Sequence, residues 1–164
     1  MTAPMTTGSK AKFVYVTYIH STPEKVFSAL TDPAVTKNYW GNHRNKSDWK
    51  PGSKWSHEDH DDATKLDIVG TVVENTPPRR LVVTWASPAD EGQAAKTSRV
   101  TYDVEPFMEM VKLTVTHDEL EPDSDMAKGI AAGWPMVLSS LKTLLESGAP
   151  MEMTKKRMTR PPAA

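Results

Sequence analysis

Hydrophobic and polar positions alternate in residues 13–20, FVYVTYIH, where aromatic and β-branched side chains dominate. A period of two is typical of a β-strand. It places Tyr15 and Thr17 on one face of that strand, together with Phe13 and Ile19. The patterned part of the chain therefore opens with a strand that has an inward and an outward face.

Two short helices are predicted directly after this strand. Thr22 is placed to cap the first helix, and Pro23 occupies its first position. Asp32 and Pro33 repeat the same two signals, and Gly41 closes the second helix. The stretch that follows, NHRNKSDWKPGS, shows no period and is predicted to be an irregular loop.

Period-two patterning then continues from about residue 54 to residue 120, in five segments separated by turn residues. One face of these segments is apolar and the other is polar, as in an antiparallel sheet lying on a core. The residues predicted to share the apolar face include Trp55, His57, Ile68, Gly70, Val72, Leu81, Val83, Trp85, Val100, Tyr102, Val104, Leu113, Val115 and His117. Because Gly70 lacks a side chain, it either bends the sheet or makes room for a neighbour.

A long amphipathic helix is predicted over residues 125–146. Asp123 or Ser124 caps its start, and Gly148 stops it. Pro135 removes a backbone hydrogen bond inside this helix, so we expect a bend there. The apolar stripe consists of Trp134, Val137, Leu138, Leu141, Leu144 and Leu145, and Ala127, Ile130 and Ala131 extend it backwards.

The chain has 164 residues, of which 38% are hydrophobic, and this is the size of one domain with its own core. We expect residues 12–148 to form that single domain. Residues 1–11 are small and polar without a period, and residues 149–164 combine prolines with basic side chains. Both ends are therefore predicted to be disordered.

Charge and composition exclude several classes of function. The 20 basic and 21 acidic residues give a net charge of -1, which is too small to attract phosphate backbones, so no nucleic-acid partner is expected. The absence of cysteine excludes disulfides and thiolate chemistry and suits a cytoplasmic localisation. No apolar run is long enough for a membrane span or a signal peptide.

The order of the predicted elements resembles the helix-grip fold of START and Bet v-like domains. Several motifs, in the same order, are similar to the bacterial branch of the SRPBCC superfamily related to the heat-shock-protein-90 ATPase activator (AHSA-like): TPEKVFSALTDP, SDWKPGSKW, GTVVENTPPRRLVVTW, SRVTYDVEP, VKLTVTH and GWPMVLSSLKTLLESG. The resemblance covers about residues 13–148. It implies an α+β fold in which a curved six-stranded antiparallel sheet wraps around the long C-terminal helix, with an apolar cavity between helix and sheet.

The candidate ligand-binding residues lie on the faces that such a cavity would expose. They are Tyr15, Thr17, Trp40, Trp55, His57, Trp85, Tyr102, His117, Trp134, Leu138 and Leu141. The four tryptophans are hard to pack without gaps, and each carries an N–H group that needs a partner when buried. The same residues also fit a filled core, in which His117 is a hydrogen-bonded structural histidine.

Metal and cofactor chemistry have little support in the sequence. The run HEDHDD, residues 57–62, crowds two histidines and four carboxylates together, but His57 and His60 fall on opposite faces of a continuing strand. The HExxH spacing of zinc proteases and the glycine-rich motifs of nucleotide-binding proteins are absent. We therefore expect no metal, no cofactor and no assigned catalytic residue.

The sequence favours an intracellular binding domain for a small apolar ligand, aromatic or lipid-like, acting as a monomer or a homodimer. Two alternatives remain. The resemblance implies a chaperone accessory protein related to heat-shock-protein-90 ATPase activators, with a chaperone as its partner. A cofactor-free cyclase or hydrolase would instead use His117 or Tyr102 as an acid or base within the same cavity.

Overall fold

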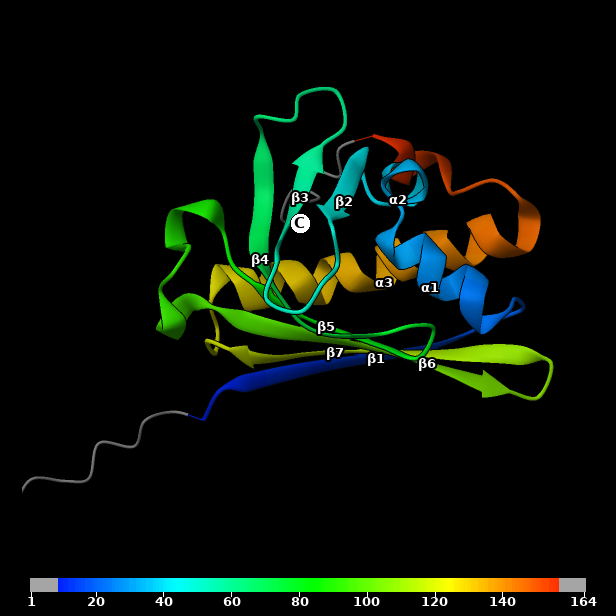
Figure 1. Ribbon diagram of the computed structural model, residues 1–164, viewed down its shortest axis with the longest axis horizontal. Coiled ribbons are helices and arrows are strands. Elements are labelled where there is room, and N and C mark those ends of the chain that lie inside the picture. The colour runs from blue at the N-terminus through cyan, green and yellow to red at the C-terminus, as the bar shows by residue number, and fades with distance from the viewer. Residues whose placement is uncertain (1–8, 157–164) are drawn as a thin grey trace, which may run out of the picture.

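One antiparallel sheet of seven strands, in the order β1-β7-β6-β5-β4-β3-β2, packs against a long helix, α3 (Figure 1). The computed structural model describes residues 9–156. The strands are β1 (Ala11–Ile19), β2 (His43–Ser47), β3 (Lys54–Asp59), β4 (Leu66–Thr76), β5 (Arg80–Trp85), β6 (Ser98–Phe107) and β7 (Met110–Leu120). The helices are α1 (Pro23–Thr31), α2 (Pro33–Tyr39) and α3 (Asp125–Ser147), and the 3-10 turns are η1 (Pro88–Asp90), η2 (Ala94–Lys96) and η3 (Glu152–Lys155).

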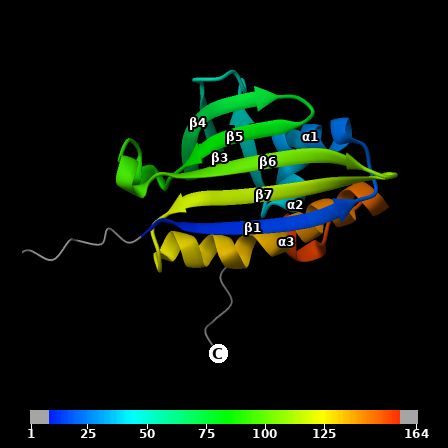
Figure 2. The same ribbon diagram turned by 90° about the horizontal axis from the view of Figure 1, so that it is seen from below.

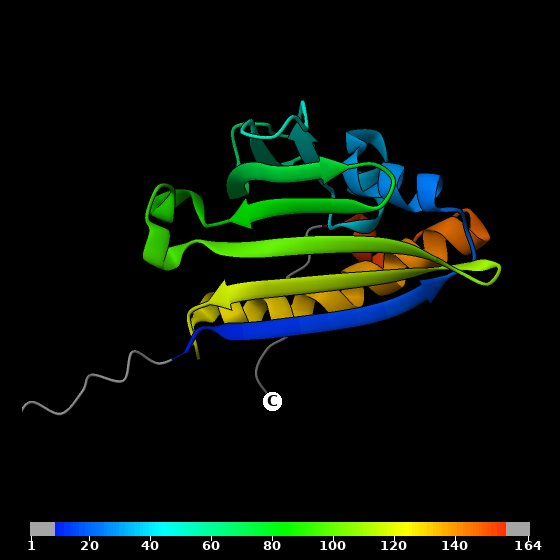
Figure 3. The same cartoon turned by 60° about the horizontal axis from the view of Figure 1, so that its bottom comes forward.

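The sheet curves around α3 from one edge to the other. Figures 2 and 3 show β1, β7 and β6 side by side with α3 behind them. Beyond β5, the strands β4, β3 and β2 turn out of that plane and rise beside α2 (Figure 1). The predicted α+β helix-grip architecture is therefore confirmed, with both short helices placed directly after β1.

The predicted helix ends are confirmed by their capping contacts. The Thr22 side chain accepts a hydrogen bond from Lys25 N, and Asp32 accepts one from Ala34 N. At the start of α3 the cap is Ser124, one of the two predicted candidates. The helix ends at Gly148, which adopts the left-handed conformation that a residue without a side chain reaches most easily.

The prediction of six strands is wrong by one, because the segment predicted as a loop after Gly41 contains β2. Its sequence, HRNKS, is wholly polar, so no hydrophobic alternation marks it. His43 and Asn45 nevertheless point inward and are each only 3% exposed. Asn45 N donates to Thr36 Oγ1 and Asn45 Nδ2 to Leu30 O, so hydrogen bonds compensate for the burial of this polar side chain.

The long helix α3 has two unequal halves. After Gly133, five residues are buried, namely Trp134, Val137, Leu138, Ser140 and Leu141, whereas before it only Ile130 is buried. The predicted extension of the stripe to Ala131 is wrong, since Ala131 is exposed. Pro135 lies inside the helix without ending it. The N-terminal half of α3 is thus held to the sheet by few side chains.

Packed structure continues beyond the domain boundary predicted at residue 148. Thr154, in η3, is fully buried, and its hydroxyl lies 2.6 Å from Ser140 Oγ on α3. Gly41 N donates to Thr154 O over 2.7 Å. The disorder predicted for residues 149–164 therefore does not apply to residues 149–156. The remainder of that tail, and residues 1–8 at the other end, lie outside the described residues.

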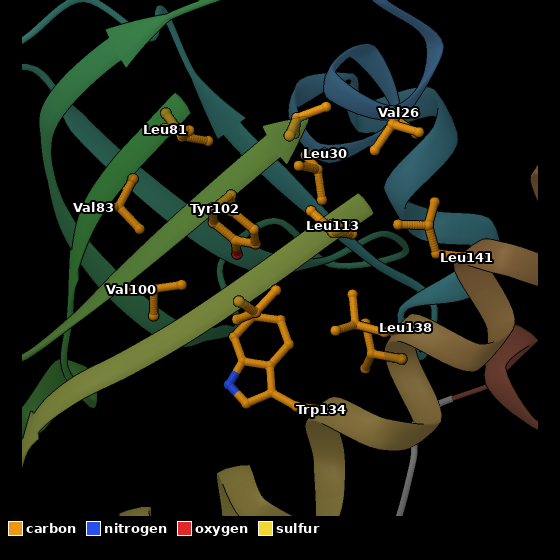
Figure 4. Packing of buried hydrophobic residues seen from close by; sticks show 14 of the residues in the cluster. Val26, Leu30, Leu81, Val83, Val100, Tyr102, Leu113, Trp134, Leu138 and Leu141 are labelled. Carbon is orange, nitrogen blue, oxygen red and sulfur yellow. The ribbon is translucent and has the colours of Figure 1, made fainter. Parts of the chain in front are cut away.

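The core fills the space between α3, α1 and the concave face of the sheet (Figure 4). Its fully buried members come from every layer, for example Leu30 on α1, Leu113 on β7 and Leu138 on α3. Within residues 9–156, no helix combines the length and apolar character that crossing a lipid bilayer requires.

Candidate functional site

Four tryptophans converge in the middle of this core. The ring of Trp134 on α3 lies 5.3 Å from that of Trp40 and 5.6 Å from that of Trp85. Trp85 in turn lies 5.5 Å from Trp55. Tyr102 meets Trp134 edge to face at 5.9 Å. Trp40, Trp55, Trp85, Tyr102 and Trp134 are therefore brought together as predicted, and we call these five residues, with His57 and His117, the aromatic cluster.

A directed chain of hydrogen bonds runs through this cluster. Trp134 Nε1 donates to His117 Nδ1 over 3.1 Å, and an indole N–H can only donate. A neutral His117 must then carry its proton on Nε2, which lies 2.7 Å from Ser98 Oγ. Ser98 Oγ donates in turn to Trp85 O over 3.2 Å. Trp134 Nε1, both ring nitrogens of His117 and the Ser98 hydroxyl each have a hydrogen-bond partner.

The same hydrogen bonds determine what His117 can do chemically. Burial lowers the pKa of His117 to about 4, which the adjacent Asp118 carboxylate partly opposes, so the imidazole is neutral at pH 7. The Ser98–His117 pair looks like a nucleophile and its base, but its Nε2 proton is directed at the serine. His117 therefore has no free lone pair with which to activate Ser98 or a substrate.

His57 occupies a second buried polar position. Its Nδ1 lies 2.7 Å from Asn45 Oδ1, and its ring stacks on His43 with centroids 4.8 Å apart. Burial, together with repulsion from His43, lowers the pKa of His57 to about 3. Burial also raises the pKa of Tyr102. Neither side chain is placed to exchange protons at neutral pH.

Gly70 makes room for Trp55. The two residues are paired across β3 and β4, and the Trp55 indole crosses over Gly70 so that its Nε1 donates to Thr84 O on β5 over 2.8 Å. A methyl group on Gly70 would overlap both Thr84 O and Trp55 Nε1. Gly70 was predicted either to bend the sheet or to make room for a neighbour, and the structure shows the second role. The register shift in the pairing of β4 with β5 does not fall at Gly70 but between Val72 and Glu74.

The interior beside this cluster is filled. A small enclosed space lies next to Trp55 and Tyr102, and it has no room for a molecule the size of water. Leu138 and Leu141 are fully buried among the core residues. The cavity implied by the family resemblance is therefore closed at this point of the structure by side chains that contact one another.

The other two predicted site residues, Tyr15 and Thr17, do not join the aromatic cluster. Both lie on the inner face of β1, the outermost strand on that side of the sheet. They are only partly buried, and none of the ring contacts of the cluster involves Tyr15. The structure thus separates the eleven candidates into a buried group and a pair at the sheet edge.

A hollow of about 540 Å³ lies at the N-terminal end of α3 and includes the buried Ser98 in its lining. We call it the α3 pocket. Its walls are the start of α3, the end of β7 and the connection between β5 and β6. It is lined by Ser87, Asp90, Lys96, Ser98, Glu119, Leu120, Glu121, Ser124, Asp125, Met126 and Gly129.

The α3 pocket and the aromatic cluster meet at two residues. Ser98 lines the pocket and accepts from His117. Met126 also lines the pocket, and its Sδ lies 3.3 Å from Trp85 Nε1. The flexible side chain of Met126 and the hydroxyl of Ser98 therefore link the open hollow to the buried tryptophans.

A second hollow, of about 440 Å³, lies beside α1 and the β4–β5 turn. Phe27, Trp49 and Pro78 give it an apolar lining. Trp49 Nε1 donates to Thr31 O, so the indole is fixed at the wall. This hollow has no contact with the His117 chain, and we regard the α3 pocket as the better candidate.

Among residues 9–156, no three histidine, aspartate or glutamate side chains lie close enough together to hold a metal ion. The HEDHDD run does not converge on one point: His57 is buried in the core, while Asp61 lies at the surface beyond the end of β3 and accepts from Asn42. Asp59 and Asp62 accept hydrogen bonds from the turn that follows β3, which lowers the pKa of both carboxyls.

Sequence reasoning missed Ser98 and Met126. A signal for Ser98 was present, since it continues the inward alternation of Val100 and Tyr102 by one step towards the N-terminus. Its role depends on His117, which lies on the neighbouring strand, and no sequence pattern states that contact. Met126 lies one turn before Ile130 on α3, but its contact with Trp85 joins residues 41 positions apart.

The curved sheet, the paired short helices and the long C-terminal helix define a helix-grip domain of the SRPBCC superfamily. Residues 20–146 match the family described as activator of Hsp90 ATPase homolog 1-like protein, and the chain belongs to this family. The recognition made from the sequence motifs is thus confirmed. No functionally curated protein matches the sequence significantly.

Solved structures with the same fold come from varied sources. The solution structure of CalU16 from Micromonospora echinospora has a TM-score of 0.70 at 19% identity, over 92% of this chain and 75% of that one. The Aha1 dimer from Colwellia psychrerythraea has a TM-score of 0.68 at 20% identity, over 84% and 98%. PFC0360w, an HSP90 activator from Plasmodium falciparum, has a TM-score of 0.68 at 22% identity, over 85% and 97%. At these identities the likeness shows the fold alone.

Proposed function

We propose that this protein binds a small, largely apolar molecule in the α3 pocket, at the N-terminal end of α3, and not in the filled core around the aromatic cluster. The observation that carries the proposal is a hollow of about 540 Å³ with two apolar lining residues, Leu120 and Met126, of which Met126 contacts Trp85 of the aromatic cluster. This volume lies within the usual range of small-molecule sites.

Three of the residues predicted from the sequence have a role in this proposal. Trp85 lies directly behind Met126, and His117 with Trp134 holds Ser98 at the wall of the pocket. An apolar ligand that displaces the Met126 side chain gains contact with the Trp85 ring. None of the eleven residues predicted from the sequence lines the α3 pocket itself.

Two helical glycines provide a matched test. Gly129 lines the α3 pocket, Gly133 does not, and a side chain added at either position meets no atom within 4 Å. Gly129→Phe is expected to fill the pocket, while Gly133→Phe places the same side chain one turn further along α3.

The probe is N-phenyl-1-naphthylamine, a neutral apolar dye whose fluorescence rises on leaving water. We expect it to bind the unaltered protein and to bind Gly129→Phe at least five-fold more weakly, with Gly133→Phe unchanged. Equal binding to both variants, or no binding to the unaltered protein, would reject the α3 pocket as the ligand site.

A second candidate function is that of a chaperone accessory protein, which family membership favours together with one surface. Val14, Val16 and Tyr18 on the outer face of β1 are between 39% and 49% exposed. Phe107 contacts the Tyr18 ring at 5.1 Å, and Met108 beside it is 91% exposed. An apolar patch on an outermost strand is typical of a protein-contact surface.

The chaperone candidate predicts that the protein changes the ATPase rate of the cognate heat-shock-protein-90 chaperone, and that Val16→Lys removes the effect. Val73→Lys is the control, because Val73 on β4 is 50% exposed, close to the 43% of Val16, and does not belong to the patch. An ATPase rate that the unaltered protein leaves unchanged would exclude this function.

A further inference from the structure

The hydrogen-bonding capacity of Ser98 limits what it can offer to a ligand in the α3 pocket. A serine hydroxyl has one proton and two acceptor lone pairs. The proton of Ser98 is committed to Trp85 O, and one lone pair accepts from His117 Nε2. Ser98 is only 5% exposed, so one remaining lone pair is all it presents to the pocket it lines. It can accept a hydrogen bond from a ligand but cannot donate one.

Ser124, at the opposite wall, has the same restriction. Its hydroxyl donates to Glu121 O over 2.7 Å and accepts from Ala127 N over 3.1 Å. Its proton is committed to the turn that begins α3. The second serine of the pocket therefore also has only an acceptor to offer.

The charged residues of the pocket have the same preference. Four carboxylates line it, from Asp90, Glu119, Glu121 and Asp125, against one ammonium group, Lys96. Lys96 Nζ lies 3.7 Å from Asp90 Oδ1, so these two charges compensate each other. Among residues 9–156, no ion-pair partner lies within 4 Å of Glu119, Glu121 or Asp125, although the charge of Glu119 also attracts Arg99.

Few hydrogen-bond donors oppose these acceptors. Besides Lys96, the pocket has the Ser87 hydroxyl and the first-turn N–H groups of α3. The partial positive charge of that helix terminus is met by Asp125, which lies in the first turn. The serine acceptors and the excess of carboxylates in the pocket thus both favour the same kind of ligand group, one that donates hydrogen bonds and carries a positive charge.

We infer that the α3 pocket prefers ligands that carry a protonated amine on an apolar body, an inference that rests on the binding function proposed above. The ammonium group is held among Glu121, Asp125 and the free lone pair of Ser98, and the apolar body lies on Leu120 and Met126. A ligand with a carboxylate head would meet carboxylates and acceptors on three sides, with Lys96 already compensated.

Three probes that differ only in the head group test this preference: 4-phenylbutylamine, 4-phenyl-1-butanol and 4-phenylbutyrate. Their dissociation constants are measured at pH 7 and low salt from chemical-shift changes of the amides of Ser98 and Met126. We expect the amine to bind at least ten-fold more tightly than the carboxylate, with the alcohol between them. The preference is expected to shrink as salt is raised.

A charge-neutralised variant locates the effect. Glu121→Gln combined with Asp125→Asn changes exposed side chains only, and is expected to reduce the preference for the amine to less than three-fold. Glu105→Gln combined with Glu109→Gln removes the same charge at exposed positions on the β6–β7 hairpin, and is expected to leave the preference intact.

The outcomes separate the two proposals. If all three probes shift the pocket amides and the carboxylate binds as well as the amine, the head-group preference is wrong while the α3 pocket remains the site. If the preference persists in the pocket variant, it originates elsewhere and the inference is overturned. If no probe shifts these amides, both proposals fail.

Discussion

The two halves of α3 lie against very different surroundings. After Gly133 the helix faces the aromatic cluster, and Trp134, Leu138 and Leu141 are at most 3% exposed. Before Gly133 it faces the α3 pocket, and only Ile130 is buried. One helix therefore completes a close-packed core and also walls an open hollow. This helix-grip domain is therefore filled in the middle and open at one end.

The filled middle depends on complementary shapes. Trp55 Nε1 reaches Thr84 O because Gly70 has no side chain in its way. Trp134 Nε1 donates to His117, and both rings contact Trp85. Trp55, Trp85 and Trp134 each donate the indole N–H to a specific neighbour. In the α3 pocket, by contrast, Gly129 has open space around it.

The largest expected effect in this comparison comes from glycine. Gly70→Ala should destabilise the protein by about 4 kcal/mol, because the methyl group displaces the Trp55 indole and breaks its bond to Thr84 O. Gly129→Ala should instead raise stability by about 0.5–1 kcal/mol, since it adds a helix-favouring side chain in open space. Urea unfolding checks both, and a Gly70→Ala loss below 1 kcal/mol would contradict the close approach.

Lowering the pH should reduce the free energy of unfolding, because His117 and His57 are buried in the aromatic cluster. Burial lowers the pKa of His117 to about 4 and that of His57 to about 3, from an ordinary value of 6.5. Above pH 6.5 these groups are neutral whether the chain is folded or unfolded. Below it the unfolded chain binds protons that the folded chain does not, so stability falls by about 1.4 kcal/mol per pH unit for each histidine.

The pH effect is measured as the free energy of unfolding between pH 6.5 and pH 4. In His117→Gln, the dependence of the unfolding free energy on pH should become weaker by the contribution of one histidine. The contribution of His57 should remain. An unchanged slope would mean that His117 is not held neutral in the folded protein.

Trp134→Phe should cost about 2–3 kcal/mol, because it removes the N–H donor and leaves His117 Nδ1 buried without a partner. The hydrogen-bond chain can also be observed directly. Nitrogen chemical shifts of the imidazole should show the proton on Nε2 in the unaltered protein. A proton on Nδ1 would contradict the direction of the chain, and with it the acceptor-only state of Ser98.

The smallest effect on stability is expected at the pocket wall. Met126→Ala should cost about 1 kcal/mol, since the side chain is only partly buried and its contact with Trp85 Nε1 is a weak hydrogen bond to sulfur. It should nevertheless change Trp fluorescence and the affinity for N-phenyl-1-naphthylamine by several-fold. A large stability loss with unchanged probe binding would assign Met126 to the core and not to the pocket.

The amount that could be predicted from the sequence differs between fold and site. Hydrophobic periodicity and capping residues were sufficient for β1, α1, α2 and α3, because these signals act within a few residues. They failed for β2, whose inward residues His43 and Asn45 are polar and are held by hydrogen bonds to distant parts of the chain. The tryptophans and His117 were correctly grouped on the inner faces, but the pattern gave no indication of whether they enclosed a space.

By itself, the sequence determined which residues turn inward, where the helices begin and end, and to which family the chain belongs. The tertiary structure alone decided that the middle is filled, that His117 bonds to Ser98, and that the open volume lies beside Met126. The reason is physical: an inward direction follows from the local backbone period, whereas free volume is the difference between the space enclosed and the side chains that occupy it. That difference depends on contacts such as the Trp55 indole over Gly70, which no local pattern encodes.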